Sequence, residues 1–282
     1  MNILTFDFEE WFHILDNDST RTADQWQNYE VRIYDNMARI FDILDRHKQK
    51  ATFFCMGWMA EKYPDIVKEI ARRGYEIGSH TRMHQLVYEQ GKDIFEKDVD
   101  FSVRFLENLI GKKVKYFRAP GFSITEQTPW AFDVLTKNGI ETDCSVFPAP
   151  RAHGGFPSYG KSVPSIVRYN GLSIKELPIN YVTVWGKHLV FSGGGYFRLC
   201  PYLLLKYWTA RSEYLMSYLH PRDFDAGQPM IKELPVIRKF KSYVGLKGAE
   251  HKLNKWLSDF SFVDIPTASD MIDWEHVPIV DI

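Results

Sequence analysis

Residues 51–84 read ATFFCMGWMAEKYPDIVKEIARRGYEIGSHTRMH. The run 51–55 is short, apolar and rich in aromatic side chains, which predicts a buried strand. Residues 66–73 have the spacing of a helix and stop at Gly74, a residue common just after a helix end. Residues 75–79 predict the next strand. A strand, a helix and a strand in this order predict two parallel strands joined by a crossover helix.

The same alternation continues on both sides of this stretch and predicts an α/β fold, in an open sheet or a barrel. Helices are predicted over 36–47, 93–110, 129–138, 202–211 and 249–257, and strands over 3–6, 114–117, 214–219 and 260–263. Helix signals weaken after residue 145, where Gly and Pro are frequent and 181–185 looks like a strand. We interpret about 146–196 as a β-rich insertion with hairpin character, within a single domain spanning 1–282.

The bulk composition excludes several classes of protein. The chain has 282 residues, of which 45% are apolar and 25% charged, as in ordinary soluble domains. Its net charge of −1 provides no overall positive electrostatic field that would attract nucleic acid. No apolar run approaches the ~20 residues that span a bilayer. Three acids interrupt the first ten residues, unlike a signal peptide, and three widely spaced cysteines suit a reducing compartment. We therefore expect a cytoplasmic protein.

Two histidines follow the strand predicted at 75–79. His80 and His84 are four positions apart, so on one helical turn both imidazoles face the same side and can reach one metal ion. The chain has nine histidines, so this spacing alone is weak evidence. The alternative interpretation is a pair of surface or capping histidines. The strand that leads into them favours the metal site.

Three acids follow the first predicted strand, and one of them is the expected third ligand. In extended chain, Asp7 and Glu9 point to the same side and Glu10 to the other. One of the first pair can bind the ion while the other takes a proton from its water. The alternative is an acid-rich helix N-terminus, which the helix dipole favours and which explains Glu10 well.

Four further residues complete a hydrolytic set. Arg118 follows a strand and is placed to pair with the carboxylate base, and the backbone N–H of Gly121 is suited to hold an oxyanion. His220, at the end of the strand predicted at 214–219, is placed to protonate a leaving group. Asp143 is the candidate to orient it. The alternatives are an ordinary turn with a surface Arg and a structural His.

With these segments in place, the chain resembles the polysaccharide deacetylases of the NodB-homology, or carbohydrate esterase family 4, type. The segments that carry the resemblance are Thr5-Phe6-Asp7, Ser79-His80 with His84, Arg118 with Pro120 and Phe122, Asp143 with Ser145, and Tyr218 with His220. The first motif then departs from the family pattern at Phe8-Glu9-Glu10, and Tyr218 stands where the family has Leu. The variant start, with 193–198 and 220–225, looks like the subgroup associated with exopolysaccharide export gene clusters.

The resemblance implies a distorted (β/α) barrel of about seven strands and the hydrolysis of an N-acetyl, or alternatively an O-acetyl, group on a sugar. It implies that Asp7 is the base, that Gly121 supplies the oxyanion amide, and that Glu9 is a metal ligand with Glu10 as the alternative. Two histidines and a carboxylate suit Zn²⁺ best and also Co²⁺, Ni²⁺ or Fe²⁺.

Two other functions compete with this one. The chain would be a non-catalytic carbohydrate-binding relative if the variant first motif, Phe8-Glu9-Glu10, did not hold the metal ion in the position that catalysis needs. A glycosidase would use Asp7 with Glu9 or Glu10 as paired carboxylates, but it leaves the spacing of His80 and His84 unexplained.

The expected partner is an acetylated oligosaccharide or polysaccharide, with a lipid-linked form taken before export as one alternative. Aromatic rings that could stack on sugars are Trp11, Trp58, Trp185 and Tyr196, although most of the eight Trp are expected in the core. Basic residues gather towards the C-terminus: Arg238, Lys239, Lys241, Lys247, Lys252 and Lys255. They predict contact with an anionic membrane at its inner face, and the alternative is ordinary solvated charge.

Overall fold

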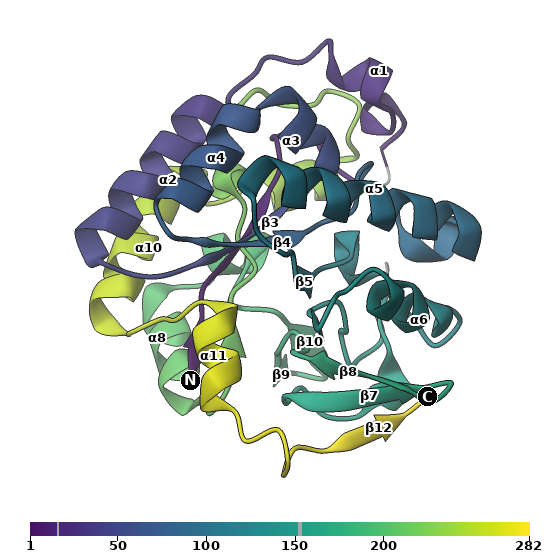
Figure 1. The fold of residues 1–282 in the computed structure, drawn as a ribbon. Helices are drawn as coiled ribbons and strands as arrows, with labels where there is room; N and C mark the ends of the chain where they lie inside the picture. Colours follow the sequence, from purple (N-terminus) through teal and green to yellow (C-terminus); the bar gives the residue numbers. More distant parts are fainter. Residues whose placement is uncertain (16, 152–153) are drawn as a thin grey trace. The chain divides into compact units, whose positions relative to one another are not determined.

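The structure, drawn in Figure 1, is a computed structural model that describes residues 1–15, 17–151 and 154–282. The chain divides into two compact units. Unit 1 comprises Met1–Ala51 and Tyr181–Asp264, and unit 2 comprises Thr52–Asn180 and Ile265–Ile282. The chain therefore starts in unit 1, builds most of unit 2, returns to unit 1 and ends in unit 2. Residues 152 and 153, within the expected insertion, lie outside the described residues.

Unit 2 contains a mostly parallel sheet. Seven of its strands are adjacent in the order β12-β7-β8-β6-β5-β4-β3. Their bounds are β3 Thr52–Cys55, β4 Glu76–Ser79, β5 Tyr116–Phe117, β6 Thr142–Asp143, β7 Ser165–Tyr169, β8 Leu172–Glu176 and β12 Ile279–Asp281. All neighbouring pairs are parallel except the hairpin β7–β8. The α/β class with a parallel-rich sheet is confirmed.

The register of this sheet decides which motif segments become neighbours. Ser79 pairs with Phe117, Phe117 with Asp143, and Asp143 with Glu176, so the carboxyl ends of four strands lie in one row. Functional side chains of α/β folds gather at this edge because parallel strands all end there. The segments beginning at His80 and Arg118 leave the sheet directly beyond this row.

Helices connect the parallel strands of unit 2, as the alternation predicts. They are α3 Gly57–Lys62, α4 Pro64–Arg72, α5 Lys92–Ile110, α6 Trp130–Lys137 and α11 Ile265–Met271, with single 3₁₀ turns at Val87–Glu89, Pro120–Phe122 and Pro157–Tyr159. The long helix α5 buries an apolar stripe that includes Phe95, Val99 and Leu106 and packs on α3, α4 and α6. The residue after its last turn is Gly111, whose φ of 69° favours glycine because a Cβ would be strained in this backbone conformation.

Unit 1 is built around the N-terminal strand segment and the chain near residue 219. Its strands are β1 Asn2–Ile3, β2 Thr5–Phe8, β9 Val182–Val184, β10 Lys187–Leu189 and β11 Leu215–Met216. β1 pairs in parallel with β11, and a single parallel bridge joins Phe6 to Leu219. The Asp7 N–H also donates to the Leu219 carbonyl at 2.8 Å. The residues that follow these two segments, Asp7 to Glu9 and His220, are thereby held side by side.

Helices complete unit 1: α1 Ala23–Trp26, α2 Ile33–His47, α7 Gly194–Leu199, α8 Tyr202–Arg211, α9 Val236–Tyr243 and α10 Leu246–Asp259, with 3₁₀ turns at Asp18–Thr20 and Pro221–Phe224. Helices α2 and α10 pack together, and both contact the turn that follows His220 (Figure 1). Trp256 of α10 is fully buried, where its ring meets Phe197 and its indole N–H donates to the Thr209 hydroxyl at 2.9 Å.

The differences from the predicted elements lie mainly at strand ends. The strand expected over 214–219 is regular only at Leu215–Met216 and continues as single bridges, and the one expected over 260–263 is a single bridge at Val263. The insertion does contain two antiparallel hairpins, β7–β8 in unit 2 and β9–β10 in unit 1. The expectation of a single domain over 1–282 stays a prediction.

Candidate active site

In unit 2, His80 and His84 lie on a loop directly after β4. The expectation that they occupy a helical turn is wrong, because Thr81 and His84 have φ values of 61° and 54°, which break any right-handed helix. The loop still brings the two imidazoles together, with ring centroids 5.3 Å apart. Asp98 of α5 fixes this conformation, since its carboxylate accepts the Arg82 N–H at 2.7 Å and the Met83 N–H at 3.1 Å.

The ring orientation of His80 suits a metal ligand. Its Nδ1 lies 2.6 Å from the Arg118 carbonyl oxygen, which can only accept, so Nδ1 carries the proton. The lone pair of the neutral imidazole is therefore on Nε2. A carbonyl against the other nitrogen is the usual support of a metal-binding His, because it fixes both tautomer and ring direction. The donor set of this unit thus fits a divalent ion.

Arg118 itself is fully buried, and its guanidinium lies 4.2 Å from the centroid of the Phe54 ring. The next residues turn sharply through Gly121, which has a φ of 62° and so a backbone that favours glycine. The Ala119 N–H donates to the Ser145 hydroxyl at 2.7 Å, which ties this turn to the chain after β6. The predicted oxyanion residue therefore sits in a fixed turn.

Asp143 acts within unit 2 as part of a buried cluster. Its Oδ1 accepts the Ser145 hydroxyl at 2.5 Å, so Asp143 orients the same hydroxyl that holds Ala119. Its neighbour across the sheet is Glu176, which is also fully buried and accepts the Val146 N–H at 3.1 Å. Burial, together with the negative charge of Asp143, raises the pKa of Glu176 well above its ordinary value.

Unit 1 places the other predicted groups in a second cluster. Asp7, Glu9 and His220 each offer one ligand atom, and these atoms lie within 4.8 Å of one another. Asp7 Oδ2 is 3.9 Å from His220 Nε2. Two carboxylates and an imidazole at this separation can hold a cation or exchange protons with a common water.

Glu10 has a different role from Glu9, as the strand alternation predicts. Its Oε1 accepts the N–H groups of Arg32 and Ile33 at 2.7 and 2.9 Å, and its Oε2 accepts the Trp11 N–H. Glu10 thus satisfies the otherwise unpaired N-terminus of α2. Burial raises its pKa to about 6 against these hydrogen bonds. Of the two glutamates, Glu9 is the one grouped with Asp7 and His220.

A residue absent from the sequence prediction orients His220. Asp223 accepts both the Nδ1–H of His220 at 3.1 Å and its backbone N–H at 2.9 Å. Its second oxygen lies 3.4 Å from Nε of Arg198, and both side chains are buried. The role expected of Asp143 thus belongs to Asp223. The signal in the sequence was an acid three residues after a histidine, the spacing of a capping box, which the turn contains.

The pKa values of this group follow from its charges. Burial alone would raise the pKa of Asp223, but the positive charges of Arg198, His220 and Arg222 hold it at about 2. Burial would lower the pKa of His220, but its hydrogen bond to Asp223 and the charges of Asp223, Glu9 and Asp7 outweigh this and raise it. His220 is therefore prepared to hold a proton, as a general acid requires.

The aromatic residues expected to stack on sugars fall into two groups. Trp11 and Trp58 are buried, and the indole N–H of Trp11 donates to the Glu30 carbonyl at 2.8 Å. The expectation is wrong for these two, whose rings belong to the core. Trp185, between β9 and β10, is 98% exposed, and Tyr196 is also exposed.

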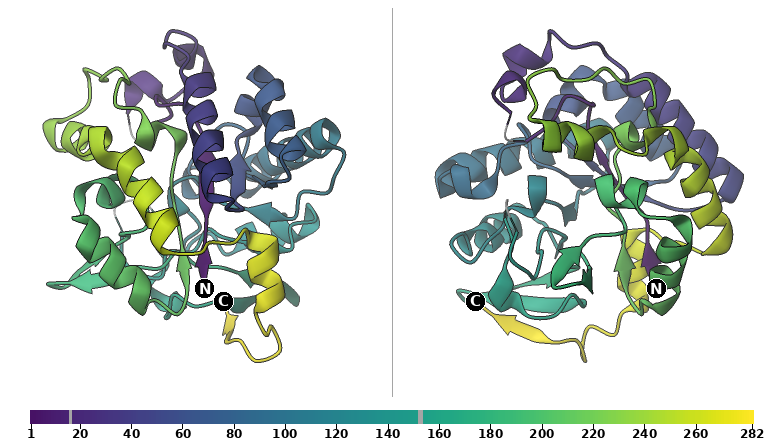
Figure 2. Two further views of the ribbon diagram at one scale, coloured as in Figure 1. Left: turned by 90° about the vertical axis from the view of Figure 1, so that its left-hand side faces the viewer. Right: turned by 180° about the vertical axis from the view of Figure 1, so that it is seen from behind.

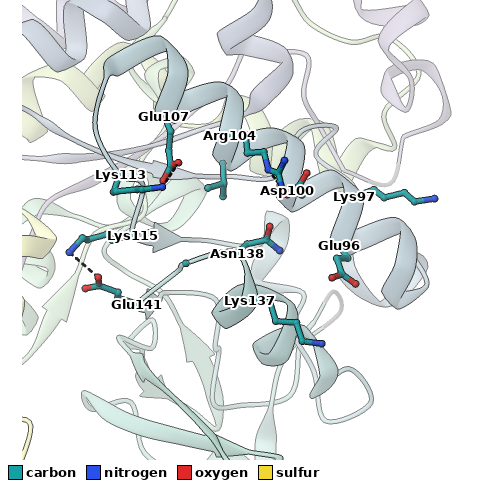
Figure 3. A pocket seen from close by; sticks show the side chains of 12 residues that line it. Glu96, Lys97, Asp100, Arg104, Glu107, Lys113, Lys115, Lys137, Asn138 and Glu141 are labelled. Atoms are coloured by element: carbon teal, nitrogen blue, oxygen red, sulfur yellow. Dashed lines mark hydrogen bonds and ion pairs between the residues drawn. The ribbon is translucent and has the colours of Figure 1, made fainter.

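Unit 2 also has an open groove between α5 and α6, which Figure 3 shows. Charged side chains line it, and several are paired with each other, including Glu107 with Lys113 and Lys115 with Glu141 (Figure 3). None of the motif residues lines this groove. We therefore place the candidate site at the motif clusters.

Two family models match parts of the chain. A family model described as polysaccharide deacetylase matches residues 22–142. This part of the chain is therefore similar to polysaccharide deacetylase domains. The match includes His80, His84 and Arg118 of the deacetylase motifs. A second model, described as a domain of unknown function (DUF3473), matches residues 144–269 and includes His220.

Curated relatives of the chain are named as deacetylases of sugar polymers or oligomers. A peptidoglycan-N-acetylglucosamine deacetylase of Bacillus cereus is 39% identical over 117 residues, which are 37% of this chain and 42% of that protein. A chitooligosaccharide deacetylase of Azorhizobium caulinodans is 33% identical over 82 residues, 29% of this chain and 39% of that protein. The matched segment thus covers less than half of either relative.

Solved structures share the fold over nearly the whole chain. A Mycobacterium smegmatis protein assigned to the polysaccharide deacetylases has a TM-score of 0.64 at 20% identity, over 98% of this chain and 91% of that one. A CE4 family pseudoenzyme of Bacillus anthracis has a TM-score of 0.53 at 14% identity, over 99% of this chain and 69% of that one. The fold expected from the resemblance, that of the CE4 deacetylases, is confirmed. In the part of the chain that the structure describes, every helix is too short or too polar to cross a bilayer.

Proposed function

We propose that this deacetylase domain is an active, divalent-metal-dependent enzyme that removes N-acetyl, or alternatively O-acetyl, groups from a sugar of a surface or exported polysaccharide. The observation that carries the proposal is the hydrogen bond from Nδ1 of His80 to the Arg118 carbonyl, because it presents the Nε2 lone pair as a metal-binding His requires. The named activities of the curated relatives support the substrate class.

We assign the metal to His80, His84 and Glu9, with Zn²⁺ as the first choice and Co²⁺, Ni²⁺ or Fe²⁺ as alternatives. A bound divalent ion would polarise the acetyl carbonyl and acidify the attacking water. Glu9 is preferred to Glu10 because the Glu10 oxygens already accept three backbone N–H groups.

The remaining residues divide the proton transfers. Asp7 takes the proton of the water that attacks the acetyl carbon, and the Gly121 N–H donates to the oxyanion that develops. His220 gives its Nε2 proton to the departing sugar nitrogen, so that the C–N bond breaks and acetate and a free amine result. Asp223 holds Nδ1 of His220 and stabilises its charged form. Asp143 and Ser145 keep the turn that contains Gly121 in place. Arg118 is assigned to pair with the carboxylate base.

The test pairs metal analysis with acetate release from N-acetylglucosamine oligomers and peptidoglycan fragments. The His80→Ala variant should lose bound metal and activity together. The His220→Ala variant should keep its metal and lose about 10²–10⁴-fold in kcat. The exposed His251 provides the control, because His251→Ala should leave both quantities unchanged.

Three outcomes would contradict the proposal in different ways. Full activity after chelation of the metal would show that the reaction does not require it. Shortened oligosaccharides without acetate would indicate the glycosidase alternative. Sugar binding without any product, by a chain loaded with metal, would indicate a non-catalytic relative like the Bacillus anthracis pseudoenzyme.

A further inference from the structure

Helix α9 of unit 1 has its apolar side turned outwards. None of its eight residues is buried, and Val236, Ile237 and Phe240 are 82%, 70% and 56% exposed. At 3.6 residues per turn these three side chains lie on one side of the helix. A surface helix of a globular protein normally shows the opposite arrangement, with its apolar side against the core.

Polar contacts hold α9 to the rest of unit 1. The Arg238 guanidinium donates to the Leu15 carbonyl at 2.5 Å, and the Tyr243 hydroxyl accepts the Ile231 N–H at 2.9 Å. Arg198 of α7 donates to the carbonyls of Lys241 and Ser242 at 2.9 and 2.7 Å. These contacts fix the orientation of the helix, so the fold of unit 1 itself holds the apolar face towards the solvent.

Two neighbouring helices extend the exposed apolar surface. Helix α7 packs against α9, and α8 follows α7 after two residues in the green part of the ribbon (Figure 2). Leu199 of α7 and Leu203 and Tyr207 of α8 are exposed. Leu203 is 77% exposed, while Leu205 on the opposite side of α8 is fully buried. Exposed large apolar side chains that gather on neighbouring helices mark a contact surface more often than single scattered ones.

The charges around α9 indicate what the surface contacts. Residues 230–247 contain five basic residues and one acid, a net charge of +4 in a chain whose total is −1. Lys239 and Lys241 flank the apolar side chains on either side of the helix. One basic residue of the predicted membrane contact is instead used within unit 1, because the Lys252 ammonium donates to the carbonyls of Phe197, Arg198 and Cys200 at the end of α7. Lys255 lies over the Tyr202 ring and is exposed.

We infer that the outward face of α9, continued by α7 and α8, docks on an anionic phospholipid bilayer. Val236, Ile237 and Phe240 enter the boundary between headgroups and acyl chains, while Lys239 and Lys241 remain at the level of the lipid phosphates. A second copy of the chain would bring two segments of charge +4 together, and a soluble polyanion would leave the apolar side chains in water. The bilayer satisfies both features, and it would hold the enzyme next to a lipid-linked glycan. The cytoplasmic location itself stays a prediction.

The experiment is co-sedimentation of the full chain with vesicles of phosphatidylcholine alone and of phosphatidylcholine mixed with phosphatidylglycerol. Binding should require the anionic lipid and should weaken as salt is added. Replacing Lys239 and Lys241 together with Gln should lower the partition coefficient about 30-fold, since each basic residue near the surface contributes about fivefold. The pair Ile237→Ser and Phe240→Ser should lower it at least about tenfold.

Helix α5 and the turn that follows it supply matched controls in the other unit. Ile94 is 63% exposed, and Lys97 and Lys112 are exposed as well, so Ile94→Ser and the pair Lys97→Gln and Lys112→Gln should leave binding unchanged. Acetate release from soluble oligosaccharides should be the same in all variants, which separates this inference from the proposed function.

The inference would be overturned by equal binding to both kinds of vesicle, by α9 variants that bind like the α5 controls, or by the absence of binding. Loss of binding in the Lys variant but not in the Ser variant would indicate a soluble polyanion instead. Self-association that the Ser variant abolishes, without lipid binding, would indicate a second copy.

Discussion

The contact between His220 and Asp223 makes a prediction that can be tested on stability and on catalysis together. The perturbation is Asp223→Asn, which keeps the shape of the side chain and removes its charge. In the folded chain this carboxylate is buried, accepts two N–H groups of His220 and lies 3.4 Å from Arg198 Nε. The substitution therefore leaves the buried Arg198 opposite a neutral group.

The magnitude follows from the shift in the pKa of Asp223. That pKa falls from 3.8 to about 2 on folding, and each unit is worth 1.36 kcal/mol, so the ionised carboxylate contributes about 2.5 kcal/mol at pH 7. Because the folded pKa is the lower one, the contribution is complete above the unfolded pKa and is lost as pH falls through the folded pKa. About half of it should remain at pH 3.

The assay is urea unfolding of the wild type and of Asp223→Asn between pH 7 and pH 3. The free energies of unfolding should differ by about 2.5 kcal/mol at pH 7 and by about half as much at pH 3. Asp42→Asn is the control, because Asp42 is exposed on α2 and should change stability by less than about 0.5 kcal/mol. A difference below 1 kcal/mol at pH 7, or one that does not change with pH, would refute the reasoning.

The same variant predicts a change in the pH dependence of catalysis. Asp223 helps raise the pKa of His220, which must be protonated to act as the acid. Without the carboxylate the pKa of His220 falls. As pH rises, the variant should therefore lose its activity at a lower pH than the wild type does. We also expect kcat to fall about 10- to 100-fold with metal content unchanged. An unchanged basic limb of the pH–rate profile would show that Asp223 has no influence on the acid.

Two further predictions concern unit 2 and unit 1 in turn. Burial beside Asp143 raises the pKa of Glu176, so its contribution to stability is complete below its unfolded pKa of about 4.5 and is lost as pH rises through the folded pKa. Glu176→Gln imitates the protonated acid, so the variant should gain stability relative to the wild type between pH 5 and pH 8, which urea unfolding at the two pH values would measure. A Cβ on Gly193 would lie 1.9 Å from the Tyr218 carbonyl oxygen, so Gly193→Ala should cost about 1–3 kcal/mol, whereas Gly248→Ala, with open space in helix α10, should stabilise by about 0.4–1 kcal/mol in the same assay. Equal effects of the two alanines would contradict the steric argument.

Local sequence patterns determined much of this protein. The apolar runs with helical segments between them predicted the parallel-rich α/β fold, because hydrophobic periodicity depends on near neighbours alone. The two-residue repeat of a strand separated Glu9 from Glu10, and the structure shows Glu10 at the α2 N-terminus. The residue types needed for a hydrolytic site were visible, in order, at the predicted strand ends.

Other features depended on the tertiary structure. The loop of His80 and His84 has its conformation because Asp98, which is 16 residues after Arg82 in the sequence, accepts backbone N–H groups of the loop. Asp143 meets Glu176 because strand register, which no local pattern specifies, aligns residues 33 positions apart.

The partner of His220 and the outward face of α9 were decided in the same way. Asp223 was three residues from His220 in the sequence, but only the folded turn, with Arg198 behind it, distinguishes it from Asp143 as the orienting group. The sequence of α9 is that of an ordinary amphipathic helix, and which of its sides is buried is set by Arg198 and the chain around Leu15. Periodicity specifies that a helix has two faces, whereas long-range contacts select the one that meets the solvent.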